Sequence, residues 1–326
     1  MTFASVPQTA TALRIDATPA GYQPHFTHGA ERVWTETNCY LDLWIEILNC
    51  LGLNPVPTFA ALLSADHDGL SWTFVKPQPD ELRRLYGLEV DEENTWLPFL
   101  EMVETGPLRG VLHTAEVDSW WLCDTAGTAY RTEHVKTTIT PVRVDRERRQ
   151  LRYLHNAGLF ELSGPDFDGI FGLTSESSLS LPPYLEVIRH FPNRTQPDAL
   201  TSIVREHLSR RPDGNPITRL AACIDHATAW LPDEGMPRFH LWAFASLRQC
   251  GATAELLADL AEYLDDEHPG AADSAAPLRN VATAAKSVQF KMARVVSGRK
   301  VNVAPSLSTM ASDWQIGIDG IAQAVC

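Results

Sequence analysis

The sequence predicts an α+β protein in which a domain with an antiparallel sheet is followed by an all-helical domain. A periodic apolar helix starts at Cys39, β-branched residues alternate through residues 109–164, and helical periodicity fills residues 197–325. The strand signal nearly vanishes after Pro182. We therefore expect an N-terminal arm at 1–35, an α+β domain at 36–180 and a helical domain at 181–326.

The individual elements are predicted in order along the chain. Leu41, Trp44, Ile45 and Leu48 recur at the spacing of a buried helical stripe, and Gly52 marks the end of that helix. Its Asp42 and Glu46 are expected on a solvated face. We further predict a hairpin at 58–65 and 70–76, with a helix as the alternative for 58–65. Helices are expected at 79–86 and 95–103, and a meander of strands at 109–118, 134–145, 150–155 and 159–164. The helical domain is expected to contain helices at 197–211, 216–231, 236–250, 253–266, 276–297 and 305–325.

The composition excludes several classes of function. Of the 326 residues, 44% are hydrophobic and the net charge is −14, so the acidic surface repels nucleic-acid phosphates and no nucleic-acid partner is expected. No run approaches the ~20 apolar residues of a membrane span. Residues 1–25 lack the basic and apolar regions of a secretory signal, so a cytoplasmic location without a membrane role is expected. The six cysteines form no Cys-x-x-Cys pair, which favours free thiols and no bound metal.

One cysteine is placed for nucleophilic chemistry. Cys39 opens the first strong helix, where the helix N-terminus favours a thiolate over a thiol. His134 begins a predicted strand, and the following strand ends in His155 and Asn156. This order of cysteine, histidine and amide is that of a papain-like catalytic centre. We expect Cys39 as nucleophile, His134 as base and Asn156 as the group that orients the histidine, with His155, Asp145 and Asp118 as alternatives to Asn156.

The motifs around these residues resemble the DUF1839 family. The resemblance lies in residues 34–46, which contain Cys39, in residues 116–131 with their Asp-Thr-Ala-Gly-Thr-Ala-Tyr-Arg run, and in the stretches that begin at His134 and Tyr153. That family is similar to the N-terminal domain of butirosin-type acyltransferases, within the papain-like cysteine-peptidase superfamily. The resemblance implies a papain-like Cys-His domain, with its N-terminal helix packed on an antiparallel sheet.

The resemblance also implies an activity. It suggests a thiol acyltransferase that takes an acyl, most simply an aminoacyl, group from a carrier-protein thioester onto Cys39 and passes it to a small amine or thiol. The donor would be the phosphopantetheine arm of an acyl or peptidyl carrier protein, and no cofactor would be bound. Alternatives are a cysteine hydrolase with the same residues and a non-catalytic module that binds carrier protein. Papain-like enzymes commonly have Gln about six residues before the cysteine, where this chain has Val33.

Other residues are assigned to the surroundings of this centre. Asn38 is either a helix cap or a donor to the oxyanion formed during acyl transfer. The segment between two strands either walls an acyl pocket or is a connecting loop, and its candidate pocket residues are Asp118, Trp120, Asp124 and Tyr130. In the helical domain, a basic run is either a solvated face or a docking site for an acidic carrier protein. It comprises Lys291, Arg294, Arg299 and Lys300, with Lys286 before them.

Overall fold

The computed structural model describes residues 10–174 and 181–326. The chain divides into two compact units that interleave along the sequence. The first unit comprises 1–26, 39–55 and 78–197, and the second comprises 27–38, 56–77 and 198–326. The expected boundary at residue 180 falls outside the described residues, as do residues 1–9 of the expected arm.

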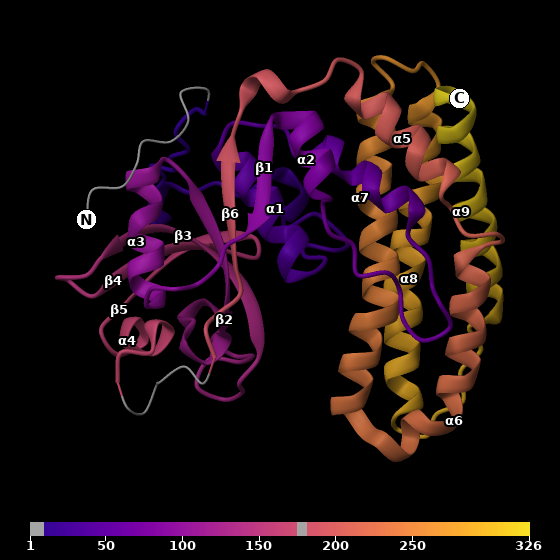
Figure 1. Cartoon of the computed structure of the whole chain (residues 1–326). Coiled ribbons are helices and arrows are strands. Elements are labelled where there is room, and N and C mark those ends of the chain that lie inside the picture. Colours follow the sequence, from indigo (N-terminus) through magenta and orange to yellow (C-terminus); the bar gives the residue numbers. More distant parts are fainter. Residues whose placement is uncertain (1–9, 175–180) are drawn as a thin grey trace. The chain divides into compact units, whose positions relative to one another are not determined.

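The first unit is built on an open six-stranded sheet in which every neighbouring pair of strands is antiparallel (Figure 1). The strand order is β1-β6-β2-β3-β4-β5. The strands are β1 Leu88–Glu92, β2 Leu112–Asp118, β3 Lys136–Asp145, β4 Gln150–His155, β5 Gly158–Ser163 and β6 Leu185–His190. The predicted meander corresponds to β2 through β5. The sequence reading missed β1 and β6, although β6 lies between β1 and β2.

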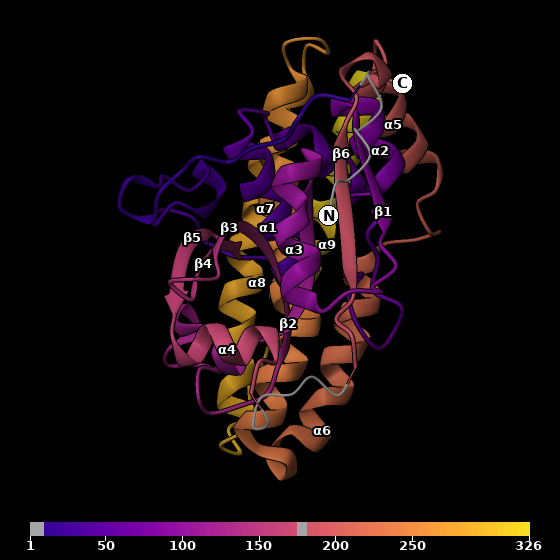
Figure 2. The ribbon, with the colours of Figure 1, turned by 60° about the vertical axis from the view of Figure 1, so that its left-hand side comes forward.

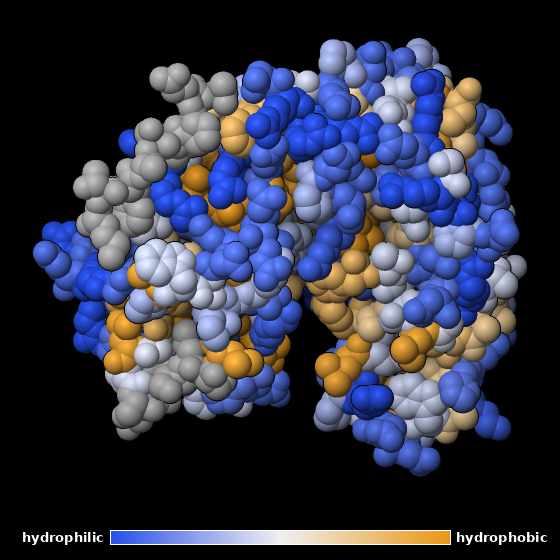
Figure 3. All heavy atoms as spheres, viewed as in Figure 1, coloured by the Kyte–Doolittle hydropathy of each residue, from blue (hydrophilic) through white to orange (hydrophobic). Residues whose placement is uncertain are grey.

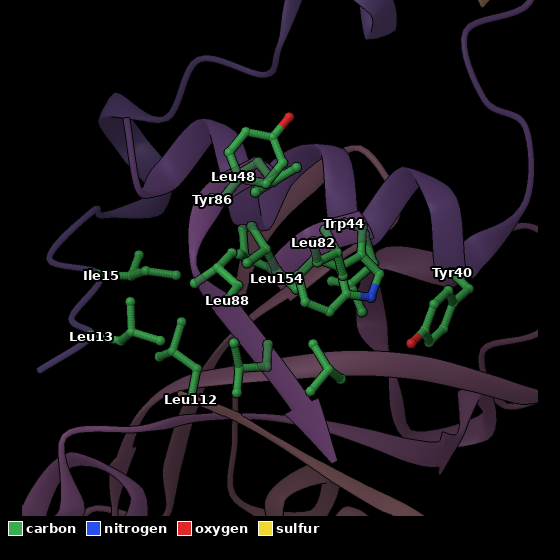
Figure 4. Packing of buried hydrophobic residues seen from close by; sticks show 14 of the residues in the cluster. Leu13, Ile15, Tyr40, Trp44, Leu48, Leu82, Tyr86, Leu88, Leu112 and Leu154 are labelled. Atoms are coloured by element: carbon green, nitrogen blue, oxygen red, sulfur yellow. The ribbon is translucent and has the colours of Figure 1, made fainter. Parts of the chain in front are cut away.

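Helices cover both faces of this sheet, as Figure 2 shows from the side. On one face, α1 Cys39–Cys50 and α2 Pro79–Tyr86 pack with the arm, and Trp44, Leu48 and Leu154 share one hydrophobic cluster (Figure 4). On the other face, α3 Phe99–Arg109 and α4 Pro165–Phe171 pack against Ile139 and Tyr153. Leu154 and Tyr153 alternate between the two clusters because successive side chains of a strand point to opposite faces.

The second unit is helical. Its helices are α5 Ala199–Ser209, α6 Pro216–Ala243, α7 Gln249–Leu264, α8 Ala275–Val295 and α9 Ala304–Val325, with a π-helical turn, η7, at Phe244–Arg248. The expected break between residues 231 and 236 appears as a kink in α6 at Gly235, whose φ is 74°. Glycine adopts this left-handed conformation without a Cβ clash, and the nearby Pro232 and Pro237 lack the N–H that a regular helix uses.

Segments from the N-terminal part of the chain complete the helical unit. Arg32 forms a two-pronged ion pair with Asp259, at 2.9 and 2.7 Å, and the Trp34 indole N–H donates to the carbonyl of Ala282 at 3.0 Å. The hairpin predicted at 58–65 and 70–76 is wrong, and the helical alternative for the first segment is confirmed. Residues Val56–Ser64 form the 3-10 helix η3, and only an isolated bridge joins His67 to Trp72.

Two properties of the described residues concern the surface and the membrane. Hydrophilic residues cover much of the face in Figure 3, while hydrophobic residues appear there in separate groups. Within residues 10–174 and 181–326, none of the helices has the length and apolar character required to cross a bilayer.

Candidate active site

Cys39 is the first residue of α1 and lies against the beginning of β3. Burial raises the pKa of its thiol, and the negative charge of Asp42 adds to this effect. Hydrogen bonding to the Thr137 hydroxyl and to the backbone N–H of Thr138 opposes it, as does the positive charge of Lys136. The helix N-terminus therefore does not make the thiolate the resting form. Cys39 rests as a thiol beside groups that can stabilise its anion.

A buried hydrogen-bonded chain starts at Thr137. Its Oγ1 lies 2.8 Å from Nε2 of His155, and Nδ1 of His155 lies 2.6 Å from Oδ2 of Asp124. The other carboxylate oxygen of Asp124 accepts a hydrogen bond from the Tyr153 hydroxyl at 2.5 Å. The side chains of His155 and Asp124 are only 2% and 5% exposed. A carboxylate only accepts hydrogen bonds, so Nδ1 of His155 carries a proton and a neutral ring leaves Nε2 as an acceptor for the Thr137 hydroxyl.

The register of the sheet explains how this chain reaches Cys39. The ladder between β3 and β4 ends at the pair Ile139 and His155, so Thr137 and Thr138 extend beyond the last paired residue of β4. His155 alternates with Leu154 and therefore shares a face with Tyr153, opposite the face that α1 covers. The hydrogen-bonded groups thus connect the two faces of the sheet at the point where β4 has ended.

His134 belongs to a second, exposed histidine–aspartate pair. Its Nδ1 lies 2.6 Å from Oδ2 of Asp118, and its ring stacks on Trp120 with centroids 4.5 Å apart. The side chain of His134 is 68% exposed, and that of Asp118 is 34% exposed. Because Asp118 also accepts from the backbone N–H of Trp120 at 3.0 Å, it fixes both members of the stack. His134 lies three residues before Thr137 in the chain.

Asn156 does not orient His134 in this structure, because that role belongs to Asp118. Asn156 occupies the turn between β4 and β5 with φ of 44°, a left-handed conformation that asparagine tolerates better than most residues. Its Oδ1 is buried and has no hydrogen-bond partner among the described residues. The side chain that the end of β4 contributes to the buried chain is that of its neighbour His155.

Asn38 directs its amide into the helical unit. Its Nδ2 donates to the carbonyl of Val75 at 3.1 Å and lies 3.4 Å from Oε1 of Gln249. The residue is 1% exposed. An oxyanion role for Asn38 would require its amide to leave these acceptors, so the backbone N–H of Cys39 is the better candidate donor.

The loop between β2 and β3 carries the four expected pocket residues, but they have different partners. Asp118 and Trp120 hold His134, Asp124 holds His155 and Tyr153, and the Tyr130 hydroxyl donates to Asp166 at 3.0 Å. The loop therefore organises both histidines. The sequence predicts Asp124 as a residue of the pocket wall. Its pairing with His155 becomes visible only in the structure.

The expected solvated face of α1 is wrong, since Asp42 and Glu46 are 1% and 0% exposed. Glu46 accepts hydrogen bonds from the Tyr22 hydroxyl, from the backbone N–H of His25 at 3.0 Å and from the Asn49 amide at 3.1 Å. These contacts tie the N-terminal arm to α1 within the first unit.

The basic run lies on α8 and the loop that follows it. Lys286, Lys291 and Arg294 line a shallow depression of about 410 Å³ together with Phe290, whose ring is 64% exposed. Arg299 and Lys300 line a second depression of about 330 Å³. The Lys286 ammonium lies over the ring of Trp34, 4.3 Å from its centroid, and burial lowers the pKa of this lysine. The surface combines positive charge with an exposed aromatic ring.

A metal centre is not built by the described residues. In the part of the chain that the structure describes, no group of three or more histidine, cysteine, aspartate or glutamate side chains is arranged to bind a metal ion.

Fold and site together define an α+β protein in which a threonine hydroxyl, a histidine and an aspartate are hydrogen-bonded in series beside a cysteine. The chain belongs to the DUF1839 family. The model of the DUF1839 N-terminal domain matches residues 23–190, and the model of the DUF1839 C-terminal domain matches residues 193–323. A search of proteins with curated descriptions finds no match to the chain.

Proposed function

We propose that this protein is a thiol acyltransferase that carries an acyl group on Cys39. The observation that supports this most strongly is the hydrogen-bonded series of Thr137, His155 and Asp124, which begins beside the thiol of Cys39. A thiol nucleophile requires a base and a group that orients the base. The papain-like ancestry implied by the family resemblance agrees with this reading and belongs to the proposal.

The first half-reaction uses the buried chain as a proton relay. The Cys39 thiol gives its proton to Thr137, which passes its own hydroxyl proton to Nε2 of His155, while Asp124 stabilises the imidazolium formed. The sulfur attacks the carbonyl carbon of a carrier-protein thioester, and the carbonyl electrons move to oxygen. Collapse of this oxyanion breaks the bond to the pantetheine sulfur, which takes the proton back from His155. The products are acyl-Cys39 and the free carrier thiol.

The second half-reaction regenerates the cysteine. An amine or thiol acceptor attacks the acyl carbon, its proton passes to His155, and the Cys39 sulfur leaves and takes that proton. An amide or a new thioester forms. Thioester donors suit this scheme because exchange between two thioesters changes little in free energy, which keeps the acyl-enzyme accessible from both sides.

His155 is the base that the geometry favours over His134. It is buried, joined to Thr137 at 2.8 Å and oriented by Asp124. His134 remains a rival because Asp118 orients it and its ring is open to solvent. The two candidates make different predictions, since replacement of Thr137 by valine removes the hydroxyl that contacts His155 and leaves the contacts of His134 with Asp118 and Trp120 intact.

The partner we propose is an acidic acyl or peptidyl carrier protein. Lys291 and Arg294 flank the exposed ring of Phe290, and this combination suits an acidic protein with an apolar contact point. We define these three residues as the α8 patch. Arg299 and Lys300 extend the positive charge beyond the end of α8.

Intact-protein mass spectrometry with a panel of aminoacylated carrier proteins tests the proposal. We expect a mass increase equal to the acyl group, mapped to Cys39, that persists until an amine or thiol is added. Cys39→Ala should abolish it, and Cys50→Ala at the other end of α1 should retain it. Release of free acid without acceptor would replace the proposal by a hydrolase, and carrier binding without adduct would replace it by a binding module.

A second measurement separates the two histidines. Under the relay, His155→Gln and Thr137→Val slow acylation of Cys39 by about 100-fold or more, the usual contribution of a positioned acid or base. His134→Gln should then change the rate only slightly. The opposite ranking would assign the base to His134.

A further inference from the structure

A second pocket lies in the first unit, along the part of β3 beyond the candidate active site. It has a volume of about 690 Å³ and is lined by the arm, α3 and the neighbouring strands. Leu13, Ile15 and Leu112, which lie close together in Figure 4, contribute apolar surface, and Val103 and Leu108 of α3 add to it. One part of the pocket therefore suits an apolar group of a few carbon atoms.

The charged side chains of this pocket fall into two groups. The first is His113, whose Nε2 lies 2.8 Å from Oε2 of Glu93; Glu93 also binds Arg109, which does not line the pocket, at 2.5 Å. Although burial opposes the effect, hydrogen bonds from His113 and Arg109 lower the pKa of Glu93 to about 2, so this carboxylate stays charged. The second group comprises Arg14, Arg143 and Arg152, with Asp16 as the one acid among the pocket's described lining residues. Set against Asp16 and against Glu161, which lies 3.3 Å from Arg152, these three arginines leave an excess of one positive charge (3 − 2) in a protein of net charge −14.

A β-bulge brings two of these arginines together. β3 pairs Pro141 with Tyr153 and then Arg143 with Arg152, so Val142 is the additional residue. Without the bulge, Val142 would face Arg152. Like charges that are directly opposite on neighbouring strands destabilise a sheet, and bulges are frequent where a side chain must be redirected at a site. The facing pair Arg143 and Arg152 therefore destabilises the protein without a ligand, and a bound anion would offset the repulsion between the two charges.

The polar contacts of Arg152 leave it able to bind a further acceptor. Nη1 of Arg152 donates to the carbonyl of Ala17 at 3.1 Å, and Nη2 lies 3.3 Å from a carboxylate oxygen of Glu161, whose side chain is 40% exposed. Its Nε is buried and has no hydrogen-bond partner among the described residues. A buried donor without a partner is unfavourable, and a ligand oxygen would satisfy it.

We propose that this pocket binds a small amphipathic anion. Its phosphate or carboxylate group would bridge Arg143 and Arg152, with Arg14 nearby, and its apolar body would contact Leu13, Ile15 and Leu108. Guanidinium groups bind both kinds of oxyanion through charge-assisted hydrogen bonds. The site contains none of Cys39, Thr137 or His155, so it is independent of the proposed acyl transfer.

Isothermal titration calorimetry on the full chain tests the proposal with four probes: inorganic phosphate, hexyl phosphate, hexanoate and hexanol. We expect hexyl phosphate or hexanoate to bind more tightly than inorganic phosphate, and hexanol to bind weakly or not at all. The tighter of the two anions identifies the head group. Absence of binding by both amphipathic anions, or equal binding of hexanol, would overturn the proposal.

Variants locate the binding site. Arg143→Gln should weaken binding about tenfold or more, because it removes one charge-assisted contact. Leu108→Glu should also weaken it by placing a negative charge at a lining position that is 76% exposed and tolerant of substitution. Arg146→Gln is the matched control, since Arg146 pairs with Glu104 and does not line the pocket. Binding that survives both test variants would place the anion elsewhere. Cys39→Ala should bind as the wild type does, whatever the outcome for acyl transfer.

Discussion

Nδ1 of His155 lies 2.6 Å from Oδ2 of Asp124, and the two side chains are almost completely removed from solvent. The same carboxylate accepts from Tyr153, so a single aspartate satisfies two buried donors. It also connects the loop between β2 and β3 to β4, which makes the position of that loop part of the site.

Removal of this carboxylate should destabilise the protein. Asp124→Ala leaves the Tyr153 hydroxyl and the His155 ring N–H buried without an acceptor, at a total cost of about 2–4 kcal/mol in the free energy of unfolding. Urea unfolding measures this cost. The control is Glu104→Ala, which removes an exposed ion pair with Arg146 and should cost about 0–1 kcal/mol. Equal effects of the two variants would mean that the buried pair contributes nothing specific.

The thiol of Cys39 should react slowly at neutral pH. Burial raises its pKa, so the thiolate fraction is small near pH 7 and grows as the pH rises above the ordinary thiol range. Iodoacetamide labelling, followed by peptide mass spectrometry, should show Cys39 reacting more slowly at pH 7 than the exposed Cys326. Thr137→Val should slow Cys39 further, because it removes a hydroxyl that favours the anion. Faster labelling of Cys39 than of Cys326 at pH 7 would contradict a protonated resting state.

The α8 patch should matter only when the donor is a protein. Lys291→Glu and Arg294→Glu should reduce the rate of Cys39 acylation by an acyl carrier protein about 10-fold or more at low salt, where charge steering is strongest. Acylation by a small thioester of N-acetylcysteamine should be unchanged. Arg238→Glu reverses an exposed charge in α6, outside the patch, and serves as the control. If both donors are slowed alike, the variants act on the fold and the patch is not a docking surface.

Gly169 should not accept a larger residue. A Cβ atom there would lie 2.0 Å from Cδ2 of Trp121, so α4 and the loop that carries Asp124 approach each other through the missing side chain. Gly169→Ala should lower the free energy of unfolding by about 1–3 kcal/mol through overpacking and should shift the tryptophan fluorescence. Gly21→Ala is the comparison, since the nearest atom to its Cβ would be 3.8 Å away. An unchanged midpoint for Gly169→Ala would show that α4 moves aside freely.

Local sequence patterns predicted the helices and strands whose own residues show a clear periodicity or alternation. α2 was predicted at its observed bounds, and α5, α8, α9 and strands β2 to β5 were expected close to their positions. The break expected between residues 250 and 253 is absent, because α7 runs through it from Gln249 to Leu264. Strands β1 and β6 were missed, although β6 is as long as the predicted strands β4 and β5. They lie apart from the meander along the chain and become strands by pairing with each other, a non-local contact that no local pattern contains.

The site was predictable only in part. Cys39 was found from its place at a helix N-terminus, and His155 was considered because it ends a strand. The pairing of His155 with Asp124 depends on how a loop folds over the sheet, and residues 31 positions apart show no spacing that reveals it. The raised pKa of Cys39 likewise reflects burial, which a local pattern does not contain.

Because the two units interleave along the chain, parts of the chain cannot be exchanged freely during evolution. A fragment that begins near residue 193, where the C-terminal family model starts, would lack Arg32 and Trp34. Asp259, 4% exposed, would lose its two-pronged guanidinium partner, and Gly251 would face the space that the Trp34 indole fills. Asp259 would keep only its contact with Arg279 at 3.2 Å, and removal of one partner from a buried ion pair destabilises a fold. Neither half can therefore be exchanged by recombination as an independent module, and substitutions at Arg32 and Asp259 are expected to change together across homologues, although most of the chain separates them.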